Sequence, residues 1–230
     1  MKDLIIEDGA AAAASRCAEL LAELARQAIE ARGMFTVAVS GGRTPWTMLE
    51  QYATADIPWE RVQLFQVDER IAPDGDPARN LTGLQRSFVE PSGIPAANVH
   101  PMPVTATDLA SAAADYASEL VEVCGEPPLL DVAHLGLGDD GHTASLVPGD
   151  PVLAIRDRTV ALTGPYQGHR RMTLTLPTLN HARHVLFLGV GEAKSALIDR
   201  LLSGDTTIPA GLIDQTRALL VTDRAGAGRA

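Results

Sequence analysis

Long hydrophobic runs, cysteine and aromatic residues are all scarce in this chain of 230 residues. Its longest apolar stretches, such as 185–188, are far shorter than the roughly 20 residues of a membrane-spanning helix, so we expect no membrane partner. The two cysteines, Cys17 and Cys124, show neither a metal-binding spacing nor a disulfide framework. We interpret both as buried, unreactive thiols and expect no structural metal.

Positive charge is also in the minority. Nineteen Lys and Arg stand against 29 Asp and Glu, which gives a net charge of −10 and an isoelectric point near 5.0. This excess repels polyanions and argues against nucleic acid as a partner, although a small anion can bind in a locally basic pocket. The acidic residues near the amino terminus do not follow the pattern of a secretory signal, so we expect a cytoplasmic protein.

Strand-like and helix-like segments alternate along the chain. Apolar and β-branched runs predict strands at 4–6, 35–39, 62–67, 129–137, 160–163, 172–176, 184–190 and 217–222. Helical spacing predicts helices that end at Gly33, begin near Pro45, run from a Thr107 cap to Gly125, and cover 194–202.

This alternation predicts an α/β fold with a doubly wound, mostly parallel, Rossmann-like sheet and helices on both faces. Polar alternation in 172–176 favours an edge strand or an antiparallel partner. No linker interrupts the pattern, so residues 1–230 are expected to form one domain, with an unstructured tail at 225–230. Four loops, at 40–44, 68–70, 138–143 and 191–194, follow predicted strands, and in a parallel sheet they converge.

The first of these loops has the composition of an anion cradle. Ser40, Gly41 and Gly42 expose backbone N–H groups beside a predicted helix N-terminus, and Arg43 adds a guanidinium. The plainer alternative is a tight turn with a solvent-exposed arginine. The segment is not a Walker loop, because the Lys-Ser/Thr ending is missing.

Two other loops each carry a cation. Lys194 is one of two lysines among seventeen arginines, and its position early in a helix is unfavourable unless an anion compensates it. Pairing with Glu192, or simple solvation, is the alternative. Arg70, which follows Asp68, is either part of the same anion site or a salt-bridged surface residue.

The loop at 138–143 carries a histidine. Residues 136–141 match the Gly-x-Gly-x-x-Gly dinucleotide pattern, but Asp139 and Asp140 would face the pyrophosphate, which argues against a nucleotide site. His142 lies in an Asp-Asp-Gly-His turn at a strand end and is a candidate general base. Asp68 and Asp140 are candidates to orient it or the attacking water.

A serine hydrolase is an alternative, because 38–42 falls one glycine short of the nucleophile elbow. Such an enzyme would need His142 beside Ser40.

Several motifs together resemble the 6-phosphogluconolactonase family over nearly the whole chain. They are Ser-Gly-Gly-Arg-Thr-Pro at 40–45, Asp-Glu-Arg at 68–70 with Asn80, Gly-Leu-Gly-Asp-Asp-Gly-His-Thr-Ala-Ser-Leu-Val-Pro at 136–148, Arg-Met-Thr-Leu-Thr at 171–175 and Gly-Glu-Ala-Lys at 191–194.

The resemblance implies hydrolysis of 6-phosphoglucono-δ-lactone, a small phosphosugar, in the oxidative pentose phosphate pathway without metal or organic cofactor. It implies that His142 activates water toward C1. It also implies a phosphate cradle, assisted by Arg171 and formed by Gly41, Gly42, Arg43, Arg70 and Lys194.

The related glucosamine-6-phosphate deaminases differ at two positions. Their pattern has an aromatic residue at Arg70 and a glutamate at Val147, so the histidine–glutamate relay of ring opening is absent here. A catalytically silent phosphosugar sensor is the other alternative, since it would keep the cations without needing His142. A monomer is the favoured oligomeric state.

Overall fold

The computed structural model describes residues 3–229 and contains a seven-stranded sheet in which every pairing is parallel. The strand order is β1-β10-β9-β6-β2-β3-β5. The strands are β1 (Asp3–Glu7), β2 (Phe35–Val39), β3 (Val62–Gln66), β5 (Val99–His100), β6 (Val132–Gly136), β9 (His184–Leu188) and β10 (Ala218–Asp223). The predicted doubly wound α/β fold is confirmed.

The chain order reverses between β2 and β6. These two strands are neighbours in the sheet, although 92 residues lie between Val39, the last residue of β2, and Val132, the first residue of β6. From β2 the chain winds outward through β3 to β5, and from β6 it winds the other way through β9 and β10. Loops that leave two such strands diverge to opposite faces of the sheet and open a crevice at their carboxyl ends. The loops after Val39 and Gly136 therefore flank the natural ligand crevice of this fold.

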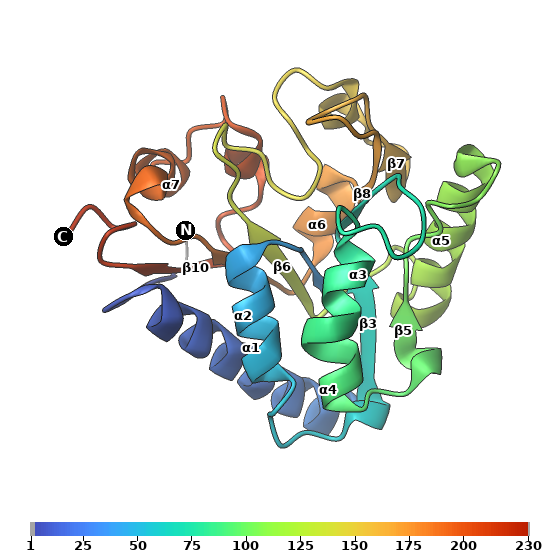
Figure 1. The fold of residues 1–230 in the computed structure, drawn as a ribbon, viewed down its shortest axis with the longest axis horizontal. Helices are drawn as coiled ribbons and strands as arrows, with labels where there is room; N and C mark the ends of the chain where they lie inside the picture. Colours follow the sequence, from blue (N-terminus) through green and yellow to red (C-terminus); the bar gives the residue numbers. More distant parts are fainter. Residues whose placement is uncertain (1–2, 230) are drawn as a thin grey trace.

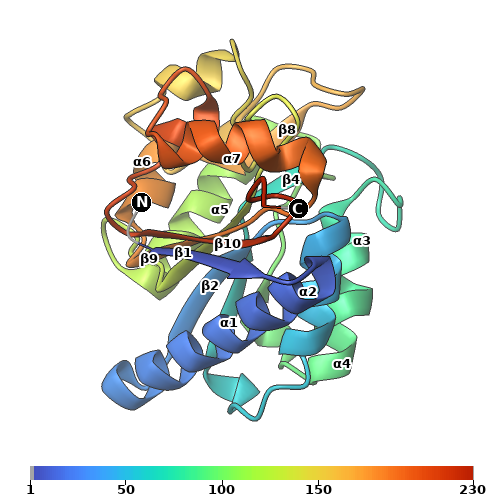
Figure 2. The same ribbon diagram turned by 90° about the vertical axis from the view of Figure 1, so that its left-hand side faces the viewer.

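Helices cover both faces of the sheet, as predicted. Figure 2 shows α1–α4 on one side of the sheet and α5–α7 on the other. Each set packs on its own apolar core. The helices are α1 (Ala10–Arg32), α2 (Arg43–Tyr52), α3 (Asn80–Leu84), α4 (Glu90–Ser92), α5 (Leu109–Cys124), α6 (Leu176–His181) and α7 (Ser195–Leu202), with a π-helical turn at Gln85–Val89 and 3-10 turns at Trp59–Arg61, Ala96–Asn98, Pro151–Ala154, Glu192–Lys194 and Pro209–Leu212.

Helix boundaries follow local chemistry in most places. Gly33 ends α1 in the left-handed conformation, with φ 77°, and its N–H bonds to the Ile29 carbonyl at 2.8 Å, as expected for a glycine stop. The cap of α5 is Asp108 rather than the predicted Thr107, because the Asp108 carboxylate accepts from the N–H groups of Ala110 and Ser111. The helical segment from 80 to 92 was not predicted.

A second, smaller sheet lies beside the carboxyl ends of the main strands (Figure 1). It pairs β4 (Asp68–Arg70), β8 (Arg171–Leu174) and β7 (Val160–Leu162) in antiparallel fashion. The antiparallel partner predicted for 172–176 is confirmed. The expectation that 68–70 is a loop is wrong, because β8 supplies the backbone partners that make this charged triplet a strand.

The carboxyl-terminal segment was expected to be unstructured, and over residues 225–229 this is wrong. Residues 225–228 form turns, and the Arg229 N–H bonds to the Arg224 carbonyl at 2.8 Å. The Asp223 carboxylate accepts hydrogen bonds from Gly226 N–H at 2.8 Å and from Gly191 N–H at 2.9 Å. One side chain thus ties the end of the chain to the turn that precedes α7. Within residues 3–229, no helix combines the length and the apolar character needed to cross a bilayer.

Candidate active site

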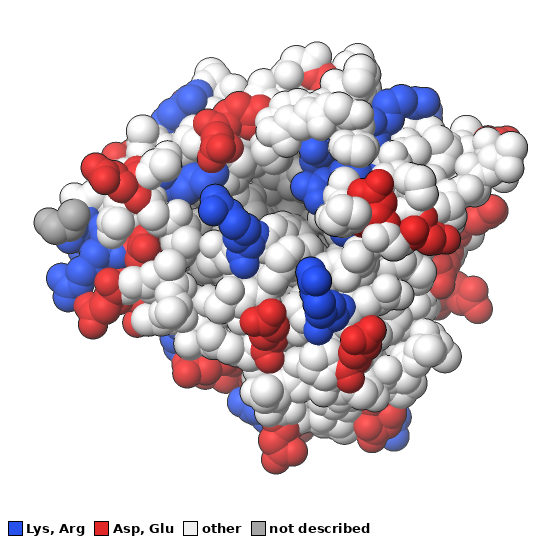
Figure 3. Space-filling model, in the orientation of Figure 1, with Lys and Arg blue, Asp and Glu red and all other residues white. Residues whose placement is uncertain are grey.

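The loops at 40–44, 138–143 and 191–194, together with strand β4, line one open cavity of about 240 Å³. Figure 3 shows this hollow near the centre of the molecule, bordered by basic side chains. Nine of the ten residues predicted for the site line it, and Asp140 is the exception. The nine are Ser40, Gly41, Gly42, Arg43, Asp68, Arg70, His142, Arg171 and Lys194.

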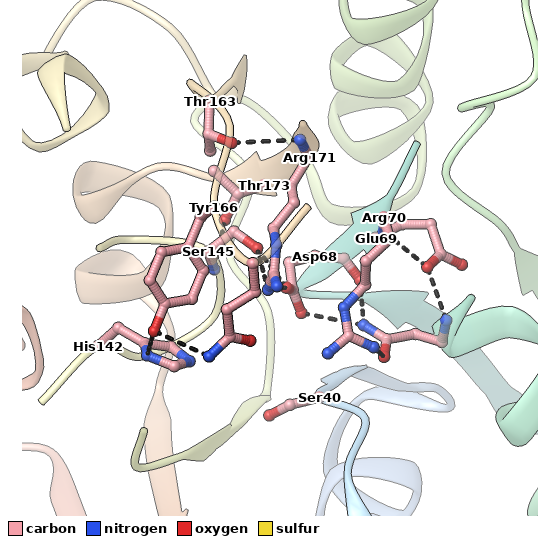
Figure 4. Close-up of polar contacts among 12 residues, drawn as sticks. Ser40, Asp68, Glu69, Arg70, His142, Ser145, Thr163, Tyr166, Arg171 and Thr173 are labelled. Atoms are coloured by element: carbon pink, nitrogen blue, oxygen red, sulfur yellow. Dashed lines mark hydrogen bonds and ion pairs between the residues drawn. The ribbon is translucent and has the colours of Figure 1, made fainter. Parts of the chain in front are cut away.

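His142 and Asp140 form a hydrogen-bonded pair at the edge of this cavity. His142 Nδ1 lies 2.6 Å from Asp140 Oδ1, and the same oxygen accepts the His142 backbone N–H at 3.1 Å. A proton on Nδ1 leaves the lone pair of Nε2 available on the side of the cavity (Figure 4). Partial burial acts to raise the pKa of Asp140, but hydrogen bonds from His142 and Tyr166 outweigh it and hold the pKa below its ordinary value.

Glycines in the 138–142 turn make room for the imidazole. The Gly138 N–H bonds to the His142 carbonyl at 2.8 Å, which closes the turn. A methyl group on Gly138 would overlap Nδ1 and Cε1 of His142. Gly141 has φ +82°, a conformation that L residues rarely adopt. The glycine spacing that resembles a dinucleotide fingerprint therefore serves the placement of His142.

Asp68 and Asp140 lie in different parts of the site. Asp68 accepts hydrogen bonds from the hydroxyl of Ser145 and, at 3.2 Å, from Asn80 Nδ2. Its Oδ2 is 3.9 Å from Arg171 Nη1. Of the two candidate orienters, Asp140 contacts the His142 ring, whereas Asp68 lies among the groups that hold the arginines.

Arg70 and Arg171 are opposite one another in the β4–β8 ladder. Like charges in this position repel, so an anionic group between or beside the two guanidinium groups stabilises this arrangement. The Nε atoms of both are buried and have no hydrogen-bond partner among the described residues. Burial lowers the pKa of Arg171, and the neighbouring Arg70 acts in the same direction against the opposing effect of Asp68. Such unpaired guanidinium donors suit an oxyanion.

The Ser40–Gly42 turn is tied to the sheet by its serine. Ser40 Oγ donates to the His134 carbonyl at 2.8 Å and accepts the Gly136 N–H at 3.1 Å. The hydroxyl is thus bonded to the backbone of β6, which argues against the serine-hydrolase alternative. Gly42 has φ +135°, and a methyl group on Gly41 would overlap the Asn80 side chain.

Lys194 ends the 3-10 turn before α7 and forms an ion pair with Asp139. The alternative of pairing with Glu192 or solvation is replaced by this contact. The hydrogen bond and charge of Lys194 lower the pKa of Asp139. Asp139 is 92% exposed, so its carboxylate can turn to solvent when an anion approaches Lys194.

The model of the family described as glucosamine-6-phosphate isomerases/6-phosphogluconolactonase matches residues 8–222. The chain belongs to this family. The 6-phosphogluconolactonase of Synechocystis sp. is 36% identical over 206 residues, covering 88% of this chain and 82% of the relative. The 6-phosphogluconolactonase of Nostoc sp. is 34% identical over 221 residues, covering 93% and 92%.

Solved structures of the glucosamine-6-phosphate isomerase/6-phosphogluconolactonase family have the same architecture. The crystal structure of 6-phosphogluconolactonase from Thermotoga maritima has a TM-score of 0.88 at 26% identity and covers 97% of this chain and 100% of its own. A monomeric glucosamine-6-phosphate deaminase has a TM-score of 0.84 at 18% identity, covers 100% of both chains, and shares the fold.

The sequence analysis named Asn80 in a motif without giving it a role, and it missed Tyr166. Asn80 accepts from Arg70 Nη1 at 2.6 Å and donates to the Asp68 carbonyl at 3.0 Å, so it fixes the arginine. Tyr166 donates its hydroxyl to Asp140 Oδ2 at 2.9 Å. The only local signals were an asparagine after a Pro/Gly-rich loop and an aromatic residue ahead of a glycine.

Within residues 3–229, no group of three or more His, Cys, Asp or Glu side chains is arranged to hold a metal ion.

Proposed function

We propose that this protein hydrolyses 6-phospho-D-glucono-1,5-lactone to 6-phosphogluconate, a step of the oxidative pentose phosphate pathway. One observation carries the proposal. His142, bonded to Asp140 through Nδ1, lines the same cavity as Arg70, Arg171 and Lys194. A base and a group of cations around one cavity suit a substrate with an ester at one end and a phosphate at the other. The names of the Synechocystis and Nostoc relatives support this substrate.

In the proposed reaction, His142 Nε2 takes a proton from water while the oxygen of that water attacks C1 of the lactone. A tetrahedral oxyanion forms and collapses with cleavage of the bond from C1 to the ring oxygen. The imidazolium then returns its proton to the ring oxygen, which leaves as the C5 hydroxyl. Asp140 holds the Nδ1–H tautomer and stabilises the imidazolium. Asp68, which lines the cavity, takes the supporting role of orienting Arg171 and the bound water.

The phosphate is proposed to lie against the backbone of Ser40, Gly41 and Gly42 and the side chains of Arg43, Arg70, Arg171 and Lys194. Binding a remote dianion holds the lactone carbonyl at the base, so that energy from the phosphate contributes to the chemical step. The lining of this site runs from residue 40 to residue 194, and strands β1 and β10, which lie outside that range, pair in the same sheet. We accordingly assign the chain to one domain.

The test compares acid release with and without enzyme, because the lactone also opens spontaneously. Wild type should accelerate release from the phosphorylated lactone above the buffer control. His142→Ala should reduce this acceleration by roughly 10² or more and still bind 6-phosphogluconate. Retained turnover in His142→Ala would overturn the mechanism. Binding without any turnover in wild type would instead indicate the phosphosugar sensor.

A further inference from the structure

We propose that Tyr166 is a positioning residue that fixes Asp140, and through it the tautomer and orientation of His142. The inference rests on the proposed function only in the role of His142, because the contacts of Tyr166 can be tested without substrate.

Tyr166 lies at the tip of the hairpin between β7 and β8. It pairs with His169 through two backbone hydrogen bonds, of 2.9 and 3.2 Å. The two residues between them, Gln167 and Gly168, have φ values of +49° and +83°. Positive φ at both central positions is the signature of a tight type I′ hairpin turn, and it is strained for glutamine. The turn fixes the position of Tyr166, because both the N–H and the carbonyl of Tyr166 bond to His169 on the returning strand.

The hydroxyl of Tyr166 contacts both members of the pair, and Figure 4 shows its contact with His142. It donates to Asp140 Oδ2 at 2.9 Å and lies 3.3 Å from His142 Nδ1. Gln167 Nε2 donates to the same hydroxyl at 3.2 Å, which directs the hydroxyl proton toward the carboxylate. With Oδ2 occupied by Tyr166, Oδ1 of Asp140 accepts both the ring and the backbone N–H of His142. Each carboxylate oxygen thus has its own donor.

The ring of Tyr166 packs between the base and a cation. It meets the His142 ring edge to face, with centroids 5.3 Å apart and planes at 70°. The guanidinium carbon of Arg171 lies 5.0 Å from the Tyr166 centroid, within cation–π range. Tyr166 does not line the cavity that His142 and Arg171 line. It therefore acts behind these residues, on their geometry.

The titratable and charged groups around His142 determine the direction of the expected pH effect. They are the carboxylates of Asp139 and Asp140 on its own turn, the neutral hydroxyl of Tyr166 and the guanidinium of Arg171 on the hairpin, and the ammonium of Lys194 on the turn before α7. The Tyr166 hydroxyl is one of the donors that lower the pKa of Asp140. A carboxylate that loses this donor holds a protonated imidazole more strongly. Because catalysis needs the neutral base, the acidic limb of the kcat/KM profile then moves to higher pH.

The first experiment compares Tyr166→Phe, which keeps the ring, with Tyr166→Leu, which removes it. Tyr166→Phe is expected to lower kcat about tenfold, as for a lost hydrogen bond to a charged group, with KM changed by less than about twofold, since phosphate contacts remain. The acidic limb of the kcat/KM profile of Tyr166→Phe shifts to higher pH. Tyr166→Leu lowers kcat further, and thermal unfolding verifies that each variant is folded.

Tyr52→Phe is the matched control. It removes a hydroxyl that is buried in the core and has no hydrogen-bond partner among the described residues. Its kcat and pH profile should equal those of wild type. Nitrogen NMR of the His142 ring supplies a readout without substrate: the neutral ring carries its proton on Nδ1 in wild type, and Tyr166→Phe gains the Nε2–H tautomer.

The two proposals fail separately. If Tyr166→Phe leaves the tautomer, kcat and pH limb unchanged while His142→Ala is inactive, the positioning role is wrong and the lactonase mechanism stands. If His142→Ala remains active but Tyr166→Phe changes the tautomer, the positioning contact stands and the catalytic role of His142 is wrong.

Discussion

Arg70 lies directly opposite Arg171 in the antiparallel ladder of β4 and β8. Two facing guanidinium groups repel, so a bound dianion should stabilise the folded protein. We expect 6-phosphogluconate at about 100 times its Kd to stabilise wild type by roughly 2.7 kcal/mol. At the same concentration Arg70→Gln should show a smaller rise in Tm, whereas Arg16→Gln on the outer face of α1 should match wild type. Equal rises in Arg70→Gln and wild type would contradict the cradle.

Gly138→Ala should displace the His142 ring, because the added methyl group overlaps Nδ1. A displacement of about 1 Å at a reacting group costs on the order of 10² in rate. We expect kcat to fall by about that factor with little change in KM. Gly9→Ala is the control, since a methyl group there meets nothing within 4 Å. Equal kcat values for Gly138→Ala and Gly9→Ala would contradict this prediction, because they would show that the His142 ring tolerates the added methyl group.

Lys194→Met should weaken recognition of the phosphate and leave the base intact. One lost hydrogen bond to a charged group predicts a KM roughly tenfold higher for the phosphorylated lactone. Rates on unphosphorylated gluconolactone should not change. Asp139→Asn keeps the cation and removes its ion-pair partner, so its KM should not rise. Steady-state kinetics on both lactones make the comparison, and an equal loss on both would place Lys194 elsewhere in the mechanism.

His134 should make the protein less stable in mild acid. Its ring is fully buried, neither ring nitrogen has a hydrogen-bond partner among the described residues, and burial lowers its pKa to about 4. Between pH 6.5 and 4 the unfolded chain therefore binds more protons than the folded one, and stability falls as the pH falls, by up to about 3 kcal/mol.

Urea denaturation at pH 7.5 and pH 5 measures this loss. His134→Leu removes the titrating group from an apolar site, so its stability should change less between these two pH values. Identical pH dependence in His134→Leu and wild type would assign the acid sensitivity to other groups.

Ser40→Ala separates a water-based mechanism from a covalent one. The Ser40 hydroxyl is bonded to the backbone of β6, so we expect its loss to reduce kcat by no more than about tenfold. A serine nucleophile would instead lose nearly all activity. A fluorophosphonate probe should not label the wild-type protein, and labelling that Ser40→Ala abolishes would revive the hydrolase alternative.

The main sheet was predictable because its signals are local. A buried parallel strand needs a continuous apolar run, and such runs mark 35–39 and 184–190 in the sequence. The strand at Asp68–Arg70 was not predictable, because three residues with charged side chains have no strand pattern of their own. They pair with Arg171–Thr173, about a hundred residues later in the chain.

The same distinction applies to the site. The convergence of the loops at 40–44, 138–143 and 191–194 follows from parallel strands, whose carboxyl ends share one edge. Which carboxylate orients His142 depends on the fold of one turn, and the sequence left Asp68 and Asp140 as equals. The contact of Tyr166 with Asp140 depends on the hairpin between β7 and β8, which brings its tip to the 138–142 turn. No sequence pattern around residue 166 indicates this contact.

One carboxylate oxygen, Asp223 Oδ1, accepts N–H groups from both Gly191 and Gly226. The end of β10, the turn before Lys194 and the turns at 225–228 therefore share a single anchoring atom. A displacement of any one of them is transmitted to the other two, so the position of the Lys194 ammonium depends on a segment that lines no part of the cavity.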